Sequence, residues 1–383
     1  MTSTERAGRR AAYAPIPGVR ILRLGGRRLL YSEDHQQVLE LNETAERIWL
    51  ALAASGSVSA AAQALAALGL PLKQATQFVA DAALQWTAAG LVAPTALEAL
   101  LASGRPADRT LAIDELILDL HLLGVDGRDL DPVFGHFHAP AARAGARARL
   151  AIVEHAGQLL FYLERRLVLA CGPEGLAANV KAVLTDLYVD AVENGFLTHG
   201  ALLSKNDRSL LLSAEPGAGK TTLALALAAA GWSYGGDDIV RIDPDGLARG
   251  VPFAAAVKSG GAPLLSAAWP VLDRLPEWVR TDGQRARYLL PPARSLTPRP
   301  LGLVVTLARR AGAPAAVQPI SPVEALDAII HSACARRWRM TGEALANLAG
   351  TLERAVCVRL EYSDLEPAVR AIEGIAGVQA EAA

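Results

Sequence analysis

The residues best suited to chemistry form a glycine-rich segment near the middle of the chain. Residues 214–221 read Ala-Glu-Pro-Gly-Ala-Gly-Lys-Thr. The apolar run 210–212 precedes them, and the alanine-rich stretch 222–230, which has helical character, follows. A strand, a glycine loop and a helix in this order are the setting that a phosphate-binding P-loop requires.

Each residue type in this segment has a role in holding a nucleotide. Gly217 and Gly219 let the backbone turn its N–H groups toward phosphate oxygens, and the helix N-terminus adds a field that favours anions. Lys220 supplies a cation for the β and γ phosphates, and the Thr221 hydroxyl is a ligand for Mg²⁺. The predicted nucleotide-binding residues are Glu215, Pro216, Gly217, Ala218, Gly219, Lys220, Thr221 and Thr222.

Two features bear on the strength of this motif. Ala214 stands where the usual pattern has its first glycine, so the backbone there must suit alanine. The alternative is an accidental turn in an alanine-rich chain. Lysine usage argues against it, because the chain has only five lysines among its 38 basic residues and one of them follows Gly219.

Two further motifs flank the loop. His199-Gly200 lies upstream at the expected start of a strand, and Asp237-Asp238 lies downstream, after Gly235-Gly236, in the segment 234–240. Paired carboxylates suit phosphoryl transfer, since one can accept a hydroxyl proton while the other helps to hold Mg²⁺. Because successive side chains of a strand point to opposite faces, both can face a phosphate only if the backbone turns there.

The spacing of these three motifs resembles the HPr kinase/phosphorylase family. The resemblance implies that Asp237 is the base that activates the acceptor hydroxyl, that Asp238 is a metal or positioning ligand, and that His199 supports the phosphates or an aspartate. It also implies ATP and Mg²⁺ as cofactors and an oligomeric assembly as a possibility. The alternatives are a polar strand terminus for the aspartates and a hydrogen-bonded structural role for the histidine.

Two more cations are candidates for contact with phosphate or substrate. Lys258 is another of the rare lysines, and Arg294 is a weaker candidate because arginine is abundant in this chain. The chain departs from the family between Arg241 and Gly261, where no counterpart of the glycine-rich segment with an acidic metal ligand is found. This departure argues against phosphorylase activity and against HPr as the substrate.

The first ordered block, residues 15–95, has a different pattern. Strands are expected at 19–24, 28–31 and 37–41, with Gly25-Gly26 as a hairpin turn. Asn42 is placed to cap the helix 43–53. Two more helices are expected at 57–68 and 72–89, the latter ending at Gly90. This order predicts a small winged-helix unit.

Within this block, Leu39-Glu-Leu-Asn42, Thr44-Ala45 and Ile48-Trp49 resemble the PqqD-type family of recognition elements for ribosomally made peptides. The resemblance implies a groove for an extended leader peptide, formed by residues 36–39 and by the face of the third helix, 72–86. Core packing is the alternative for Trp49, Phe78 and Trp86, and it is favoured for Trp49. DNA binding is disfavoured because the third helix offers only Lys73 as a cation.

Composition sets wider limits. The net charge is -1, and no signal-peptide core or long uncharged apolar run is present, which predicts a cytoplasmic protein that binds neither membrane nor nucleic acid. Three scattered cysteines, Cys171, Cys334 and Cys357, indicate neither disulfides nor a zinc site. The expected division is a flexible tail at 1–14, a recognition domain at 15–95, a linker at 96–110 and a kinase domain at 111–383.

The remaining patterns complete that last domain. Strands are expected at 111–123, 149–153, 159–163, 167–170, 298–307 and 356–362, and helices at 174–194, 323–337, 343–349 (stopped by Gly350) and 365–375. The predicted fold class is therefore an α/β P-loop kinase domain, HPr kinase-like, with an N-terminal winged-helix α+β peptide-binding domain.

Together the motifs predict an ATP-dependent kinase that phosphorylates a serine or threonine hydroxyl of a precursor peptide captured by its leader segment. Two alternatives stay open: a small-molecule kinase, and a nucleotide-switched peptide-binding chaperone that transfers no phosphate. The acceptor residue, the oligomeric state and the choice between ATP and GTP are not fixed by any motif.

Overall fold

The computed structural model describes residues 12–33, 36–95, 105–140, 145–334 and 340–381. The chain divides into two compact units. The first comprises Met1–Ala112, Ile117–Gly127 and His138–Leu176, and the second comprises Ile113–Leu116, Arg128–Phe137 and Ala177–Ala383. No helix in the described ranges is both long enough and apolar enough to cross a membrane.

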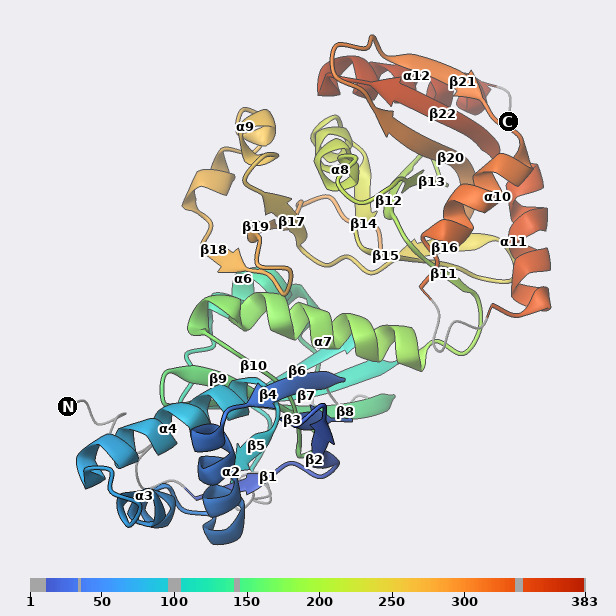
Figure 1. The fold of residues 1–383 in the computed structure, drawn as a ribbon. Coiled ribbons are helices and arrows are strands. Elements are labelled where there is room, and N and C mark those ends of the chain that lie inside the picture. The colour runs from blue at the N-terminus through green and yellow to red at the C-terminus, as the bar shows by residue number, and fades with distance from the viewer. Residues whose placement is uncertain (1–11, 34–35, 96–104, 141–144, 335–339, 382–383) are drawn as a thin grey trace. The chain divides into compact units, whose positions relative to one another are not determined.

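The first unit begins with a small three-stranded sheet and three helices (Figure 1). The strands follow the order β2-β3-β4, and Gly25 and Gly26 form the β2–β3 turn with positive φ angles, as predicted. The elements are β2 (Val19–Leu24), β3 (Arg27–Ser32), β4 (Gln37–Leu41), α2 (Glu43–Ser55), α3 (Val58–Ala66) and α4 (Leu72–Ala88).

Side-chain caps fix the starts of two of these helices. The side chain of Asn42 accepts a hydrogen bond from the N–H of Ala45, as predicted, and that of Ser57 accepts one from Ala60. Trp49 and Trp86 pack edge to face in the core, with ring centroids 5.3 Å apart. The core-packing interpretation of Trp49 is therefore confirmed.

The rest of the first unit is a five-stranded sheet with the order β10-β9-β8-β7-β6. A separate two-stranded antiparallel sheet is formed by β1 (Tyr13–Pro15) and β5 (Val92–Pro94). The strands of the larger sheet are β6 (Arg109–Ile113), β7 (Leu116–Leu123), β8 (Ala146–His155), β9 (Gln158–Leu163) and β10 (Arg166–Cys171).

Two predicted boundaries differ from this arrangement. Tyr13 is buried in β1 and its hydroxyl lies 2.9 Å from Nε2 of His155, so the predicted tail at 1–14 is too long at its C-terminal end; residues 1–11 lie outside the described residues. The five-stranded sheet groups with the N-terminal residues and not with the P-loop, because Ile16 joins an apolar cluster with Val153 and Leu160. Residues 96–104 of the predicted linker also lie outside the described residues.

The second unit is built on a nine-stranded mixed sheet. Its main path is β11-β15-β16-β20-β13-β12-β14, and β22 pairs with β20 and with β21. The strands are β11 (Phe196–His199), β12 (Ala201–Lys205), β13 (Arg208–Ser213), β14 (Ser233–Gly236), β15 (Ile239–Ile242), β16 (Leu247–Gly250), β20 (Arg299–Arg309), β21 (Ala316–Pro319) and β22 (Val356–Tyr362).

Helices cover both faces of this sheet, because side chains alternate between the faces along each strand. Leu210 and Leu212 pack in one core with residues of α8 and α12, whereas Leu211 packs in another with residues of α10 and α11 (Figure 1). The helices of the unit are α7 (Leu176–Ala191), α8 (Lys220–Ala229), α10 (Pro322–His331), α11 (Gly342–Arg354) and α12 (Leu365–Glu381).

A small sheet with the order β17-β19-β18 and several short helical turns complete the second unit. These elements are β17 (Ala255–Lys258), β18 (Glu277–Val279), β19 (Arg285–Leu289), α9 (Ala262–Leu265), η4 (Pro270–Arg274), η1 (Arg128–Leu130), α6 (Asp131–Phe134) and η2 (Gly135–Phe137). η3 (Pro173–Gly175) leads into α7.

Two predicted helix ends are wrong. α11 does not stop at Gly350 but continues to Arg354, because the buried Thr351 and Leu352 outweigh the roughly 1 kcal/mol by which glycine disfavours a helix interior. α10 ends at His331, six residues before the predicted end, and residues 335–339 lie outside the described residues.

Candidate active site

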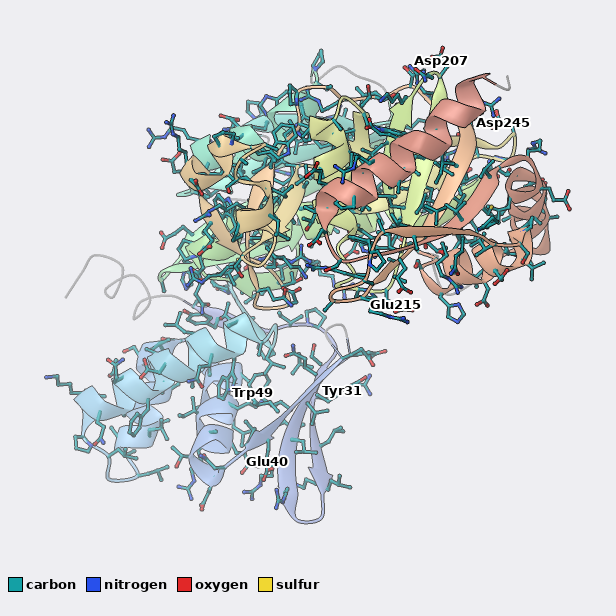
Figure 2. All side chains as sticks on the ribbon, turned by 90° about the horizontal axis from the view of Figure 1, so that it is seen from above. Tyr31, Glu40, Trp49, Asp207, Glu215 and Asp245 are labelled. Carbon is teal, nitrogen blue, oxygen red and sulfur yellow. The ribbon has the colours of Figure 1, made fainter. Side chains whose placement is uncertain are left out.

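The predicted P-loop lies between the end of β13 at Ser213 and the start of α8 at Lys220. Figure 2 labels Glu215 in this loop. Gly219 has a φ of 96°, and a Cβ there would lie 2.8 Å from the Tyr362 hydroxyl oxygen. That hydroxyl donates a hydrogen bond of 3.1 Å to the Ala218 carbonyl, so β22 holds the loop in place.

The Ala214 departure has a local explanation. Ala214 is not among the residues with positive φ, so its backbone suits alanine. Its carbonyl accepts a hydrogen bond of 2.6 Å from Nζ of Lys220. Lys220 is 6% exposed, and burial lowers its pKa, while Glu215 and the two aspartates act in the opposite direction. The lysine is thus folded back onto its own loop and must release the carbonyl to reach a phosphate.

Asp237 and Asp238 lie between two strands and not on one. β14 ends at Gly236 and β15 begins at Ile239, so the backbone turn that the paired carboxylates require is present. Gly236 has a φ of 146°, and a Cβ there would lie 2.3 Å from the Val251 carbonyl oxygen. Glycine is therefore needed at this turn.

The first aspartate is fixed by a buried tyrosine. Asp237 is 5% exposed, and its Oδ1 accepts a hydrogen bond of 2.9 Å from the Tyr234 hydroxyl. Burial, followed by the charge of Asp237, raises the pKa of Tyr234 well above its usual value of 10, so the hydroxyl remains a donor. The Phe253 carbonyl lies 3.1 Å from the same hydroxyl. Asp237 is therefore oriented by a hydrogen bond from a neutral hydroxyl and not by an ion pair with a described residue.

The second aspartate has cationic or polar partners on both oxygens. Nδ1 of His199 lies 3.1 Å from Oδ1 of Asp238, and Nζ of Lys181 lies 2.9 Å from Oδ2. Burial alone would raise the pKa of Asp238, but the charge of Lys181 and the contact with His199 outweigh it and lower that pKa below its usual range. The structure thus brings His199 to an aspartate, at the end of β11 and not at a strand start.

Lys181 of α7 was not found by the motif analysis. It is fully buried among Asp238, the Phe253 ring at 5.3 Å and the Tyr288 ring at 5.7 Å. Burial would lower its pKa, but the carboxylates of Asp238 and Asp237 outweigh burial and raise it. The rarity of lysine, which singled out Lys220 and Lys258, was the available signal and applied equally to this residue.

These groups share one cavity of about 530 Å³ in the second unit. Its volume lies within the range of roughly 300–1,000 Å³ that is usual for ligand sites. Parallel strands place their carboxyl ends at one edge of a sheet, which is why β13 and β20 bring the loop and Arg309 together. The charged and hydroxyl residues that line it include Lys181, His199, Lys220, Thr221, Thr222, Asp237, Asp238, Lys258, Arg280, Asp282 and Arg309.

Of the two cations predicted to contact phosphate or substrate, one lines the cavity and the other does not. Lys258 lines the cavity, at the end of β17. Arg294 does not line it, and its Nη1 donates a hydrogen bond of 3.1 Å to the Pro291 carbonyl. Arg280 and Arg309 contribute to the cavity instead. Arginines are too numerous in this chain for type alone to identify them.

The cavity also bears on the metal prediction. No cluster of three or more His, Cys, Asp or Glu side chains in the described part of the chain is arranged to hold a metal by itself. Thr221 and the paired aspartates line the same cavity as the P-loop. Mg²⁺ is usually held by one or two protein oxygens together with water and substrate phosphates, so this donor set fits a metal that arrives with a nucleotide.

Comparisons with known proteins give little further information. No protein-family model matches the chain, and no curated protein matches it. Among solved structures, the chain is similar to one described as the Hpr(Ser) kinase/phosphatase from Coxiella burnetii, at 11% identity and a TM-score of 0.23. The match covers 48% of this chain and 97% of that one. A likeness this weak carries no argument about fold or activity.

Proposed function

We propose that the second unit is an ATP- and Mg²⁺-dependent phosphotransferase that acts on a hydroxyl group. The observation that carries this proposal is the meeting of a P-loop and two differently held aspartates in one cavity, Asp237 buried and Asp238 partly buried. A P-loop alone indicates nucleotide binding, whereas a fixed carboxylate beside it is the group that a kinase needs to activate an acceptor.

The contacts suggest a division of labour. Asp237, oriented by Tyr234, accepts the proton of the acceptor hydroxyl. At the same time, the oxygen of that hydroxyl forms a bond to the γ-phosphorus. The bond from that phosphorus to the β–γ bridging oxygen breaks, and ADP leaves. Lys220 and the loop N–H groups hold the phosphates, and bound Mg²⁺ would neutralise charge on them through Thr221. Asp238 serves mainly to position Lys181 and His199 around Asp237.

We further propose that the part of the first unit formed by β2–β4 and α2–α4, here called the N-terminal module, captures the leader of a ribosomally made precursor peptide. β4 is an outer strand of its sheet, and Val38 on this strand is 62% exposed. On α4, Leu72 is 53% and Phe78 is 40% exposed. An unpaired strand edge that carries exposed apolar side chains suits the addition of an extended peptide, and the exposed apolar residues of α4 would supply side-chain pockets. Trp86 is buried, so it belongs to the core and not to the proposed groove.

Figure 2 labels two side chains on the strands of this sheet, Tyr31 on β3 and Glu40 on β4. Glu40 pairs with Arg27 at 2.9 Å, and Tyr31 accepts a hydrogen bond from Gln36. Polar side chains are therefore interspersed with the apolar ones on β3 and β4. Hydrogen bonds or ion pairs to them would favour one register of a bound peptide over another.

The test is incubation of the purified protein and Mg-ATP with precursor-like peptides encoded beside its gene, followed by intact-mass spectrometry. We expect an added phosphate on a serine or threonine when the leader is present, and no addition with the Lys220→Met protein. An unmodified peptide in the presence of bound ATP would contradict peptide phosphorylation and favour a small-molecule kinase or a nucleotide-switched chaperone.

A further inference from the structure

A second, smaller cavity adjoins the candidate active site within the second unit. It has a volume of about 180 Å³ and shares Lys181, Asp238 and Arg280 with the larger cavity. We call it the α7 annex because most of its remaining wall comes from α7. Its other lining residues are Ala178, Ala182, Thr185, Asp186, Thr281 and Tyr288.

The annex joins the larger cavity at Asp238 and not at the P-loop. P-loop residues line the larger cavity and none of them lines the annex. In phosphoryl transfer, the attacking and leaving oxygens lie roughly in line on opposite sides of the phosphorus. When a nucleotide occupies the P-loop, the attacking hydroxyl must therefore approach from the far side of its γ-phosphate. Asp238 lines both cavities, whereas Asp237 lines only the larger one. A hydroxyl that enters through the annex would therefore pass Asp238 to reach Asp237, without crossing the nucleotide site.

The size of the annex limits what it can hold. Ala178 and Ala182 lie four residues apart on α7, so they face the same side of the helix, and their small side chains leave the space open. The volume is below the roughly 300–1,000 Å³ that is typical of whole-ligand pockets. It suits one side chain and the adjacent backbone better than an entire second nucleotide.

The charges of the annex favour a cation beside the hydroxyl. Lys181 is engaged by Asp238, and Nε of Arg280 lies 3.4 Å from Asp282. The side chain of Asp186 is exposed at the annex and makes no hydrogen bond or ion pair with the described residues. Asp190 lies one turn along α7 and its charge repels that of Asp186, so a cation placed at Asp186 would relieve this repulsion.

We propose that the α7 annex is the acceptor site, and that it takes a serine or threonine side chain from a peptide segment with a basic residue next to the hydroxyl. This proposal rests on the proposed phosphotransferase function and adds to it a place and a charge preference for the acceptor. Lys181 forms part of the wall between the nucleotide and acceptor sites, where it holds Asp238.

The first test fills the annex. Ala182→Leu keeps helix propensity and adds bulk to the annex alone, and Ala191→Leu, at an exposed position of α7 outside both cavities, is the matched control. The probe is a non-hydrolysable conjugate that links the γ-phosphorus of an ATP analogue to the serine of a Lys-Ser-Lys tripeptide, and its binding is measured by calorimetry beside that of ATP.

We expect Ala182→Leu to weaken binding of the conjugate by about tenfold or more, because the larger side chain takes up space in the annex. The affinity for ATP should not change. Ala191→Leu should change neither. Equal affinities of both proteins for the conjugate would overturn the annex proposal and leave the phosphotransferase proposal intact. Failure of the unmodified protein to bind ATP would instead overturn the proposed function, and the annex proposal with it.

A second test examines the charge preference. The unmodified protein should bind the Lys-Ser-Lys conjugate more tightly than a Glu-Ser-Glu conjugate by about tenfold, and Asp186→Asn should remove most of that difference. A preference for the acidic conjugate, or a basic preference that Asp186→Asn leaves intact, would contradict the role of Asp186.

Discussion

The candidate active site and the N-terminal module differ in which kind of side chain they bury and which kind they expose. In the candidate active site, charged groups are wholly or partly buried and are held by specific partners, as Asp238 is by Lys181 and His199. In the N-terminal module, apolar side chains are exposed, among them Val38 on the edge strand β4 and Phe78 on α4. One region fixes charged groups in place through specific partners, and the other leaves apolar surface exposed to water.

The difference separates the two parts of the proposed function. Phosphoryl transfer depends on charged groups fixed within a fraction of an ångström, which buried ion pairs and hydrogen bonds can provide. Capture of an extended peptide depends on backbone pairing and apolar contact, which an exposed edge can provide. We therefore expect mutations in the first region to affect transfer or folding, and mutations in the second to affect peptide affinity alone.

The largest expected effect is at Asp237. Asp237→Asn should lower the rate of phosphate transfer by about 10²–10⁴-fold, the usual contribution of a general base, and leave ATP affinity unchanged. The rate is measured with radiolabelled ATP under saturating peptide. The control is Asp245→Asn, an exposed carboxylate labelled in Figure 2, which should transfer at the normal rate. Normal transfer by Asp237→Asn would exclude Asp237 as the base.

The next effect is on stability. Lys181→Met should lower the free energy of unfolding of the second unit by about 3 kcal/mol, because it leaves the Asp238 carboxylate without its ammonium partner. The double variant Lys181→Met/Asp238→Asn should recover most of this loss. The control is Lys205→Met, whose pair with Glu373 is more than a third exposed and should contribute less than about 1 kcal/mol. Urea denaturation measures all three, and equal losses at Lys181 and Lys205 would contradict the account.

A smaller effect is expected at the strand edge. Val38→Asp should weaken leader-peptide binding by about tenfold, which is about 1.4 kcal/mol, without altering thermal stability, because Val38 is 62% exposed. Leu24→Asp, at a 71% exposed position of β2, is the matched control for an added charge away from β4. Fluorescence anisotropy of a labelled leader measures both. Equal weakening by the two variants would place the groove elsewhere.

The smallest expected effect is a difference in acid stability between the two units. Burial lowers the pKa of His155 in the first unit below its usual 6.5, so the unfolded chain takes up the proton first and stability falls as the pH drops below 6.5. The pKa of Asp238 is lowered from its usual 3.8, so the stability it provides is retained above pH 3.8 and lost only below it.

Between pH 6.5 and pH 5, the first unit should therefore lose more stability than the second. Hydrogen exchange resolved along the sequence separates the two units. His155→Gln should remove part of the pH dependence of the first unit. Faster hydrogen exchange in the second unit than in the first as the pH falls over this range would contradict the expected difference.

Sequence alone predicted the features that depend on neighbouring residues. The strand–glycine loop–helix order around residues 214–221, the Gly25-Gly26 hairpin turn and the Asn42 cap each follow from a few consecutive residues with special backbone or capping properties. The backbone turn that the Asp237-Asp238 pair requires was likewise foreseen from the two glycines before it.

The features that the sequence did not predict depend on tertiary contacts. Lys181 meets Asp238 across 57 positions of the chain, and no local pattern marks that pairing. Arg309 enters the cavity because β20 runs parallel to β13, a register that a single sequence does not encode locally. The grouping of the five-stranded sheet with the N-terminal residues likewise depends on the cluster formed around Ile16.

The central claim is that one region delivers a peptide to the other, and its most direct test is kinetic. The measurement is kcat/KM for phosphorylation of a precursor peptide with its leader and of the same core peptide without it, using the unmodified protein and Val38→Asp. The account predicts that the leader raises kcat/KM at least about tenfold through a lower KM, and that Val38→Asp abolishes most of this gain. Equal kcat/KM values for the two peptides with the unmodified protein would contradict it.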